Sequence, residues 1–437
     1  MTTPSRMNAA DPLVFVSSFA PGEKGGIQAY HLDLPSGKLT PAEHTGEVEN
    51  PFFLALSPDH RFLYAIQAKA FGGKENEEVA AYALVGSEGK LRLLNRQSTK
   101  GSASCHLETD ATGRTLLVAN YSSGSVASLP VLPDGSLAPA ASFDQHMGGS
   151  GVEPKRQDGP YAHSFIVSPD NRFAYSADLG LDQILCYRLD AAEGRVSLLT
   201  PPSVAAPPGA GPRHLAFHPG GKWLYAINEL ANSVTRYDWD AGSGALTAGE
   251  SASTLPDGFT GKSYCADLKI TPDGKFLYGT NRGHDSVACY RVGGDGHLER
   301  FAIVPSLGKG PQNLAITPDG RWLLCANMPG NTVVVFSIDA SSGILRAIGD
   351  PVPQTSPPVS VWCLKSGTLF RSPWFSPRLT STRLESSRAF CRCHIPTTSA
   401  AGPMLWFRSR SSKTGMVPRC WFSEAITGTS TRGRSRR

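Results

Sequence analysis

Four residues of this 437-residue chain combine side chains that can move protons with side chains that can bind anions. They are His163, Arg213, Glu229 and Arg282. Histidine is the usual acid–base group near neutral pH, and a glutamate can orient a histidine or activate water. Arginine pairs with phosphate or carboxylate and stabilises an oxyanion. If the fold brings them together, these residues can support proton transfer on a small anionic molecule.

A strand–turn–strand pattern that occurs six times predicts the fold that positions these residues. Each copy has an apolar alternating segment, a turn with Pro, Asp or Gly, a basic residue and a second apolar segment, as in "RHLAFHPGGKWLYAIN" and "ADLKITPDGKFLYGTN". The basic residues recur at intervals of 46 to 58 residues. Strand-based repeats of about 40 to 50 residues are typical of β-propellers.

Each repeat predicts a four-stranded antiparallel blade, because two further strand-like segments follow, such as "SVTRYDWD" and "ALTAGESAST". Residues 13–44 match the later strands of a repeat that lacks its first strand, and this strand returns at "PVSVWCLK", residues 358–365. We therefore expect an all-β fold, a seven-bladed β-propeller over residues 13–365. Its ring is closed by pairing N- and C-terminal strands.

Comparison of equivalent positions among the repeats singles out the four residues. The entry of the first strand carries Phe52, Cys105, His163, Arg213, Ala266 and Gln312. The exit of the second strand carries Ala68, Tyr121, Leu179, Glu229, Arg282 and Met328. Both positions lie at the same end of an antiparallel pair, so the four ionisable side chains are expected at one mouth of the central channel. The alternative is a structural salt bridge from Glu229 to either arginine.

Polar residues also occupy the next position of the first strand. His106, His214 and Asp267 are candidate substrate-binding residues there, with structural hydrogen bonding as the alternative. The sequence contains no motif for a serine nucleophile, no Gly-rich phosphate loop and no cluster with metal-ligand spacing. We therefore expect no cofactor and no metal.

The C-terminal segment differs from the rest in charge. Residues 366–437 carry a net charge of +11, whereas the preceding residues carry −6. This basic Ser/Arg-rich tail has no repeat pattern, and we interpret it as disordered or as the product of a frameshift rather than as a nucleic-acid or membrane-binding segment.

Targeting and cysteine patterns favour a cytoplasmic protein. The N-terminus lacks the apolar stretch of a secretory signal, and no apolar run is long enough to span a membrane. Six of the nine cysteines lie singly in predicted strands and three lie in the tail, which indicates reduced thiols. We expect a monomer without nucleic-acid or membrane partners.

Several motifs resemble the lactonase family of seven-bladed propellers, which includes bacterial 6-phosphogluconolactonases and fungal carboxymuconate lactonizing enzymes. The resemblance covers residues 13 to about 365 and includes "GPYAHSFIVSPDNRFAYSAD", "GPRHLAFHPGGKWLYAINEL" and "LKITPDGKFLYGTNRGHDSVACY". The proposed active-site His, Arg, Glu and Arg of the family fall on the four residues chosen by the repeat comparison. The tail has no counterpart in the family.

The resemblance implies hydrolysis of a small anionic sugar lactone. The expected reaction converts 6-phosphogluconolactone to 6-phosphogluconate, a step of carbohydrate metabolism in the pentose phosphate pathway. His163 is the expected acid–base group, and Glu229 either orients it or activates water, while Arg213 and Arg282 bind anionic groups. The alternatives are carboxymuconate cycloisomerisation at the same residues and a non-catalytic propeller that binds proteins.

Overall fold

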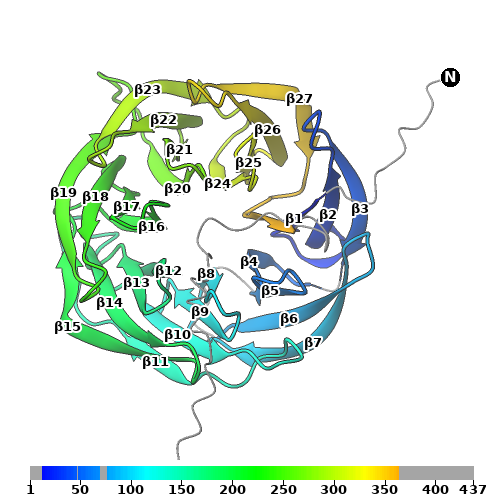
Figure 1. Cartoon of the computed structure of the whole chain (residues 1–437), viewed down its shortest axis with the longest axis horizontal. Coiled ribbons are helices and arrows are strands. Elements are labelled where there is room, and N and C mark those ends of the chain that lie inside the picture. The colour runs from blue at the N-terminus through cyan, green and yellow to red at the C-terminus, as the bar shows by residue number, and fades with distance from the viewer. Residues whose placement is uncertain (1–11, 47, 69–75, 364–437) are drawn as a thin grey trace, which may run out of the picture. The chain divides into compact units, whose positions relative to one another are not determined.

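Seven four-stranded antiparallel sheets surround a central axis in the computed structural model (Figure 1). The structure describes residues 12–46, 48–68 and 76–363. Within these ranges the helical structure is limited to one 3-10 turn, η1 (Gly22–Lys24). The predicted all-β, seven-bladed propeller is therefore confirmed. The basic tail, residues 366–437, lies outside the described residues.

Six of the blades run from an inner strand to an outer strand in chain order. The first three complete blades are β4 (Pro51–Leu56), β5 (Phe62–Gln67), β6 (Glu78–Val85) and β7 (Lys90–Ser98); β8 (Ser104–Thr109), β9 (Thr115–Asn120), β10 (Ser125–Pro130) and β11 (Ser142–Gln145); and β12 (Ala162–Val167), β13 (Phe173–Asp178), β14 (Gln183–Asp190) and β15 (Arg195–Ala205). The next three are β16 (Pro212–Phe217), β17 (Trp223–Asn228), β18 (Ser233–Trp239) and β19 (Leu246–Ser253); β20 (Tyr264–Ile270), β21 (Phe276–Arg282), β22 (Ser286–Val292) and β23 (Leu298–Pro305); and β24 (Pro311–Ile316), β25 (Trp322–Asn327), β26 (Thr332–Ile338) and β27 (Leu345–Pro353).

The seventh blade combines both ends of the propeller sequence. Its order is β28 (Ser360–Cys363), β1 (Leu13–Ser18), β2 (Gly26–Leu32) and β3 (Leu39–Thr45). The inner strand β28 pairs antiparallel with β1, from Leu13 opposite Cys363 to Val16 opposite Ser360. The predicted closure is therefore confirmed for residues 360–363, and residues 364 and 365 of the predicted strand lie outside the described residues.

A tyrosine in the second strand joins each of four blades to the next. The hydroxyl groups of Tyr64, Tyr175, Tyr225 and Tyr278 donate to the carbonyl oxygens of Gly135, Gly244, Gly296 and Gly343, at 2.7 to 3.2 Å. These glycines have φ angles of 75° to 86°, a region that disfavours residues with a Cβ atom. The aromatic residue two positions before each tyrosine packs on the same glycine. The recurrent "F/W-x-Y" motif thus fastens adjacent blades together.

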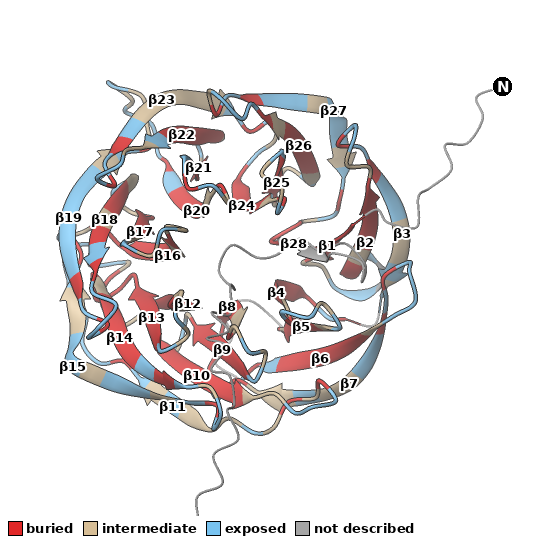
Figure 2. Ribbon diagram, in the orientation of Figure 1, coloured by how far each residue is buried: buried red, intermediate tan, exposed pale blue. Residues whose placement is uncertain are grey.

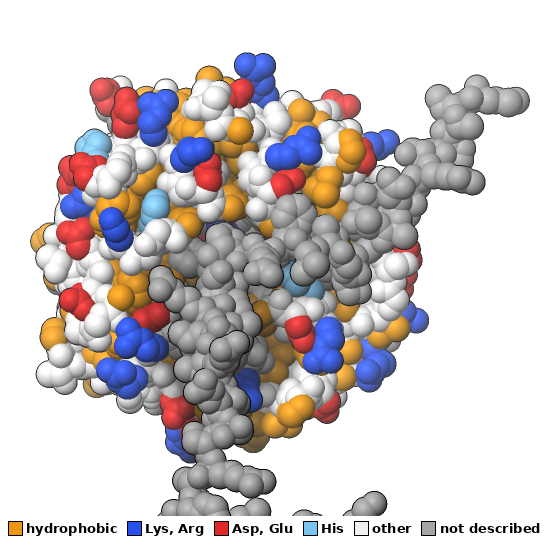
Figure 3. Space-filling model, in the orientation of Figure 1, with side chains coloured by type: hydrophobic (Ala, Val, Ile, Leu, Met, Phe, Trp, Pro, Cys, Tyr) orange, Lys and Arg blue, Asp and Glu red, His pale blue; other side chains and the backbone are white. Residues whose placement is uncertain are grey.

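Burial follows the distance of a strand from the axis. The inner and middle strands are largely buried, and the outer strands consist mostly of exposed and intermediate residues (Figure 2). On the face shown in Figure 3, acidic and basic side chains of described residues are mixed around the rim. Five cysteines of the described blades are buried and unpaired, in agreement with the expected free thiols. Among the described residues no helix is long and apolar enough to cross a membrane.

A β-bulge occurs at the same place in six inner strands. In β12 the pairing with β13 shifts between Ala162 and Ser164, and in β16 the pairing with β17 shifts between Pro212 and His214. Equivalent shifts occur in β4, β8, β20 and β24. A bulge leaves one residue without a direct partner and changes the direction of its side chain. His163 is the extra residue of β12, and Arg213 is the extra residue of β16. Each therefore lies beside the residue that follows it in its strand.

Candidate active site

The four residues selected by the repeat comparison meet at one carboxylate. Oε2 of Glu229 lies 3.0 Å from Nε of Arg213 and 3.0 Å from Nη2 of Arg282. It lies 4.0 Å from Nε2 of His163. His163 and Arg213 come from the starts of β12 and β16, Glu229 follows β17, and Arg282 ends β21. The structure therefore brings the predicted residues of three successive blades together.

The backbone around Glu229 explains how its side chain reaches this point. Its N–H donates to the carbonyl of Gly211 at 2.8 Å, and its own carbonyl accepts from the N–H of Cys265 in the next blade at 3.2 Å. Glu229 is thus held between the two inner strands that flank it. Because buried charges are costly unless they are paired, the residue is stabilised in this place by the guanidinium groups around it.

Charge pairing keeps Glu229 ionised. Burial raises the pKa of this carboxyl group, but the positive charges of Arg282, Arg213 and Arg156 outweigh burial and lower it to about 2. Burial and the charge of Arg282 lower the pKa of Arg213 to about 10, so its guanidinium remains protonated at neutral pH. The sequence left open whether Glu229 forms a structural salt bridge with either arginine. Glu229 does form these ion pairs, and the charged side chains also converge at one point.

His163 is neutral at physiological pH. Burial and the nearby charge of Arg213 lower the pKa of its imidazole well below the ordinary value. Its Nδ1 lies 3.5 Å from Sγ of Cys105, and its ring packs edge-on against Tyr121 with centroids 5.1 Å apart. The 4.0 Å separation from Glu229 exceeds hydrogen-bonding distance, so Nε2 is not bound to that carboxylate. Nε2 is therefore the atom suited to accept a proton.

His214 supports Arg213 from the adjacent position. Nη1 of Arg213 lies 3.2 Å from Nε2 of His214, and Nδ1 of His214 lies 2.8 Å from Oδ1 of Asp267. Since a guanidinium only donates, Nε2 must accept and Nδ1 must carry the proton that Asp267 accepts. Burial and Arg213 lower the pKa of His214 to about 4, which agrees with this neutral form. Arg213 also donates to the carbonyl of Ala266.

Asp267 is the fully buried centre of this supporting network. Its oxygens accept from Nζ of Lys269 at 2.9 Å and from Nδ2 of Asn313 at 2.8 Å, besides His214. Two backbone N–H groups, of Leu268 and Leu314, also donate to it at 2.9 Å. Burial raises the pKa of Asp267, but Lys269 and His214 outweigh it and keep the carboxylate ionised. Asp267 therefore acts on the site through His214.

His106 lies beside this network although it belongs to β8, two blades before the blade of His214. Its ring centroid is 5.3 Å from that of His214 and 4.6 Å from that of Phe53. Nδ1 of His106 accepts from the N–H of Phe165 at 3.4 Å. Burial lowers the pKa of His106 well below its ordinary value. The three candidate substrate-binding residues from the sequence thus lie close to the four central residues, and each forms a hydrogen bond. They are His106, His214 and Asp267.

The repeat comparison missed Arg156. This residue lies in the connection between β11 and β12, and its Nη2 is 2.5 Å from Oε1 of Glu229. Nη2 is also 3.5 Å from the hydroxyl of Tyr121, and the guanidinium lies over the ring of Tyr264, 5.7 Å from its centroid. Comparison of strand positions has no counterpart for a residue in a connection between blades. The length of this connection, residues 146–161, is the one sequence signal for it.

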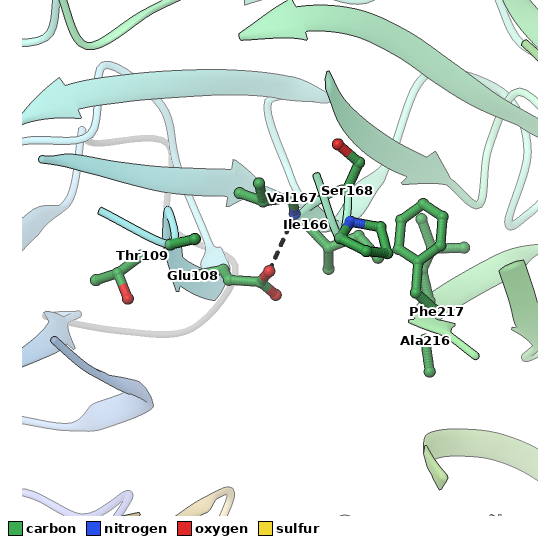
Figure 4. A pocket seen from close by; sticks show the side chains of 10 residues that line it. Glu108, Thr109, Ile166, Val167, Ser168, Ala216 and Phe217 are labelled. Atoms are coloured by element: carbon green, nitrogen blue, oxygen red, sulfur yellow. Dashed lines mark hydrogen bonds between the residues drawn. The ribbon is translucent and has the colours of Figure 1, made fainter. Parts of the chain in front are cut away.

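A separate pocket lies at the opposite ends of β8, β12 and β16 from His163 and Arg213. Figure 4 shows this pocket from close by. Its volume is about 290 Å³. Its lining includes Glu108, Val167 and Phe217. A carboxylate oxygen of Glu108 accepts from the N–H of Val167 at 3.0 Å, and burial raises the pKa of Glu108 to about 7. None of the seven predicted site residues lines this pocket.

The fold and the His–Arg–Glu–Arg cluster define a class of protein. The model of the seven-bladed β-propeller lactonases matches residues 13–363, and the chain belongs to this family. Lactone hydrolysis is the activity that the names of its relatives support at family level.

Two curated relatives match about three quarters of the chain. The chain is 33% identical over 340 residues to 6-phosphogluconolactonase of Bacillus subtilis, covering 77% of this chain and 94% of the relative. It is 33% identical to 6-phosphogluconolactonase of Formosa agariphila, covering 77% and 95%. Among solved structures, periplasmic gluconolactonase of Pseudomonas aeruginosa superposes with a TM-score of 0.75 at 31% identity, covering 80% and 99%. A putative 6-phosphogluconolactonase of Bacteroides fragilis gives a TM-score of 0.75 at 30% identity, covering 82% and 99%.

Proposed function

We propose that this protein hydrolyses 6-phosphogluconolactone to 6-phosphogluconate, as a cytoplasmic enzyme of the pentose phosphate pathway. The observation that carries the proposal is the convergence of three guanidinium groups and a neutral histidine on Glu229. Three positive charges against one carboxylate suit an anionic substrate. The names of the curated relatives support the same reaction.

In the proposed mechanism His163 is the base. Water attacks the lactone carbonyl carbon while Nε2 of His163 takes one of its protons, and the positive charge of the buried Arg213 stabilises the resulting oxyanion electrostatically. As the tetrahedral intermediate collapses, the bond from carbon to the ring oxygen breaks and His163 returns the proton to that oxygen. The products are a carboxylic acid and a hydroxyl group, so one water molecule is consumed.

The hydrogen bonds of the site favour His163 over Glu229 for this role. Both oxygens of Glu229 lie against guanidinium nitrogens, whereas Nε2 of His163 is not bound to Glu229. Burial and the positive charge of Arg213 lower the pKa of His163, and an anionic substrate near the cluster would offset the second of these effects. Glu229 then orients the arginines, and His214 with Asp267 holds Arg213 in place. His106, on β8 in the blade that precedes that of His163, contacts the substrate as well.

The test is an assay of lactone opening that compares 6-phosphogluconolactone with carboxymuconolactone. We propose that residues 13–365 form the functional domain, so the assay uses the full chain alongside a chain that ends at Lys365. The expected result is catalysed opening of the phosphorylated lactone by both, with large losses in His163→Ala and Arg282→Ala. If neither lactone opens faster than it does spontaneously, the proposal that the protein is a lactone-hydrolysing enzyme is refuted. A preference for carboxymuconolactone would favour the cycloisomerase alternative.

A further inference from the structure

The connection between β11 and β12 adds a third arginine to the site from outside the blade framework. Arg156 approaches Oε1 of Glu229, whereas Arg213 and Arg282 approach Oε2. Glu229 is therefore bound on both carboxylate oxygens by groups that prefer planar oxyanions. An anionic group on an incoming substrate would therefore compete with Glu229 for these guanidinium groups.

The connection is firmly attached next to Arg156. The side chain of Gln157 is fully buried and donates to the carbonyl of Leu179 at 2.9 Å and to Oδ1 of Asp182 at 2.7 Å. Asp182 also accepts from the N–H groups of Gly209 and Gly211, which precede Arg213 in the chain. A single buried carboxylate thus sets the positions of the Arg156 connection and of the segment that leads into β16. The backbone next to Arg156 is accordingly anchored by Gln157, which reduces the cost of ordering this segment when a ligand binds.

Exposure distinguishes two kinds of arginine in the cluster. The side chain of Arg213 is 2% exposed, whereas those of Arg156 and Arg282 are 33% and 26% exposed. Arg213 is committed to Glu229, Ala266 and His214 in the interior. The two half-buried guanidiniums are the ones that a ligand arriving from solvent can reach.

We propose that Arg156, together with Arg282, binds the phosphate group of the substrate and makes the site selective for phosphorylated over unphosphorylated sugar lactones. Glu229 occupies the same guanidinium groups when no ligand is bound, and the phosphate oxygens replace its contact with Arg156. This inference rests on the proposed lactone hydrolysis and extends it to the substrate class. It also assigns Gln157 as a positioning residue for Arg156.

Charge balance supports this assignment. The cluster of Arg156, Arg213, Arg282 and Glu229 carries a net charge of +2 when the carboxylate is ionised. A phosphate monoester carries between −1.5 and −2 charges near neutral pH and offers several acceptor oxygens. An unphosphorylated lactone is neutral and leaves the excess positive charge uncompensated. The donor groups therefore match a phosphorylated ligand better than a neutral sugar.

The experiment compares Arg156→Ala, Arg156→Lys and Gln157→Ala with the wild-type protein. Lys155→Ala is the matched control, because Lys155 is an exposed cation next to Arg156 in the chain and is not among the cations that pair with Glu229 in the described structure. Calorimetry measures the binding of 6-phosphogluconate and of gluconate, and steady-state kinetics measure hydrolysis of 6-phosphogluconolactone and gluconolactone. Thermal unfolding checks that each variant is folded.

We expect Arg156→Ala to weaken binding of 6-phosphogluconate by about 10- to 100-fold, the usual range for a charge-assisted hydrogen bond, and to change gluconate binding less than threefold. Arg156→Lys should fall between these values because it keeps the charge without the planar fork. Gln157→Ala should raise KM for the phosphorylated lactone and leave KM for gluconolactone nearly unchanged. Lys155→Ala should match the wild-type protein.

The outcomes separate this inference from the proposed function. Equal losses for the phosphorylated and unphosphorylated ligands in Arg156→Ala would overturn the inference, as would wild-type affinity for 6-phosphogluconate. Failure of the wild-type protein to hydrolyse either lactone would refute the proposed reaction, whereas the binding measurements would still decide whether Arg156 recognises phosphate.

Discussion

Nε2 of His163 lies 4.0 Å from Oε2 of Glu229, so the two groups face each other without a hydrogen bond. Glu229 is instead bound by arginines, and its pKa is lowered to about 2 although burial opposes this. The imidazole is left as the neutral group beside a positively charged cluster. This separation of roles, with one residue for proton transfer and one for organising charge, leads to the first two predictions.

Replacement of His163 by Gln should lower kcat by about 100- to 10,000-fold, the usual contribution of a positioned acid–base group. Glutamine keeps a polar side chain of similar reach but cannot accept and return a proton. Steady-state kinetics with 6-phosphogluconolactone would measure the loss, and Thr109→Ala, a change at the far end of β8, is the control for folding. A kcat within threefold of wild type would remove His163 from the mechanism.

Replacement of Glu229 by Gln should destabilise the protein by about 3 to 5 kcal/mol, because Arg213 would remain buried without its counter-charge. Urea unfolding would measure this change. Added sulfate should recover part of the loss by pairing with the exposed guanidiniums, and it should stabilise Glu229→Gln more than wild type. An equal effect of sulfate on both proteins would argue against an anion site at this position.

His214 should make stability depend on pH in the weakly acidic range. Its pKa is about 4 in the folded protein, mainly because of burial, against 6.5 as the ordinary value. Since the folded state favours the neutral form, its contribution is fully present above pH 6.5 and is lost as the pH falls towards 4. We expect His214→Asn to flatten the profile of the free energy of unfolding over this interval.

The control for the pH experiment is His297, whose pKa is raised by its hydrogen bond with Glu250 at the surface. His297→Ala should leave the weakly acidic slope close to that of wild type. If both variants keep the wild-type slope, other buried groups determine the acid sensitivity and the assignment to His214 is wrong.

Gly296→Ala should destabilise the propeller more than Gly258→Ala. Both glycines have positive φ, 83° and 77°, so both substitutions incur the left-handed backbone cost of about 1 to 2 kcal/mol. A Cβ at Gly296 would lie 2.6 Å from the ring of Trp223, whereas nothing lies within 4 Å at Gly258. Overpacking should add about 1 to 3 kcal/mol at Gly296. Similar free energies of unfolding for the two variants would show that blade packing at this glycine is easily adjusted.

The sequence by itself determined the number of blades, the ring closure and the predicted central residues of the site. The strand–turn–strand pattern occurs in six copies, and the split repeat at the two ends of the propeller supplies the seventh, so their count gives the architecture. Residues such as Glu229 and Arg282 stand out because they differ from the other copies at equivalent strand positions. This reasoning works wherever a residue has counterparts in the other repeats.

Only the tertiary structure decided which partners these residues have. Arg156 lies in a connection without an equivalent in the repeats, and its pairing with Glu229 depends on where residues 146–161 place it in space. The β-bulges also escaped the sequence pattern, although they bring Arg213 beside His214. Hydrogen bonds and charge pairing depend on the distances between side chains of separate blades. A repeat pattern identifies equivalent positions along the chain but does not give these distances.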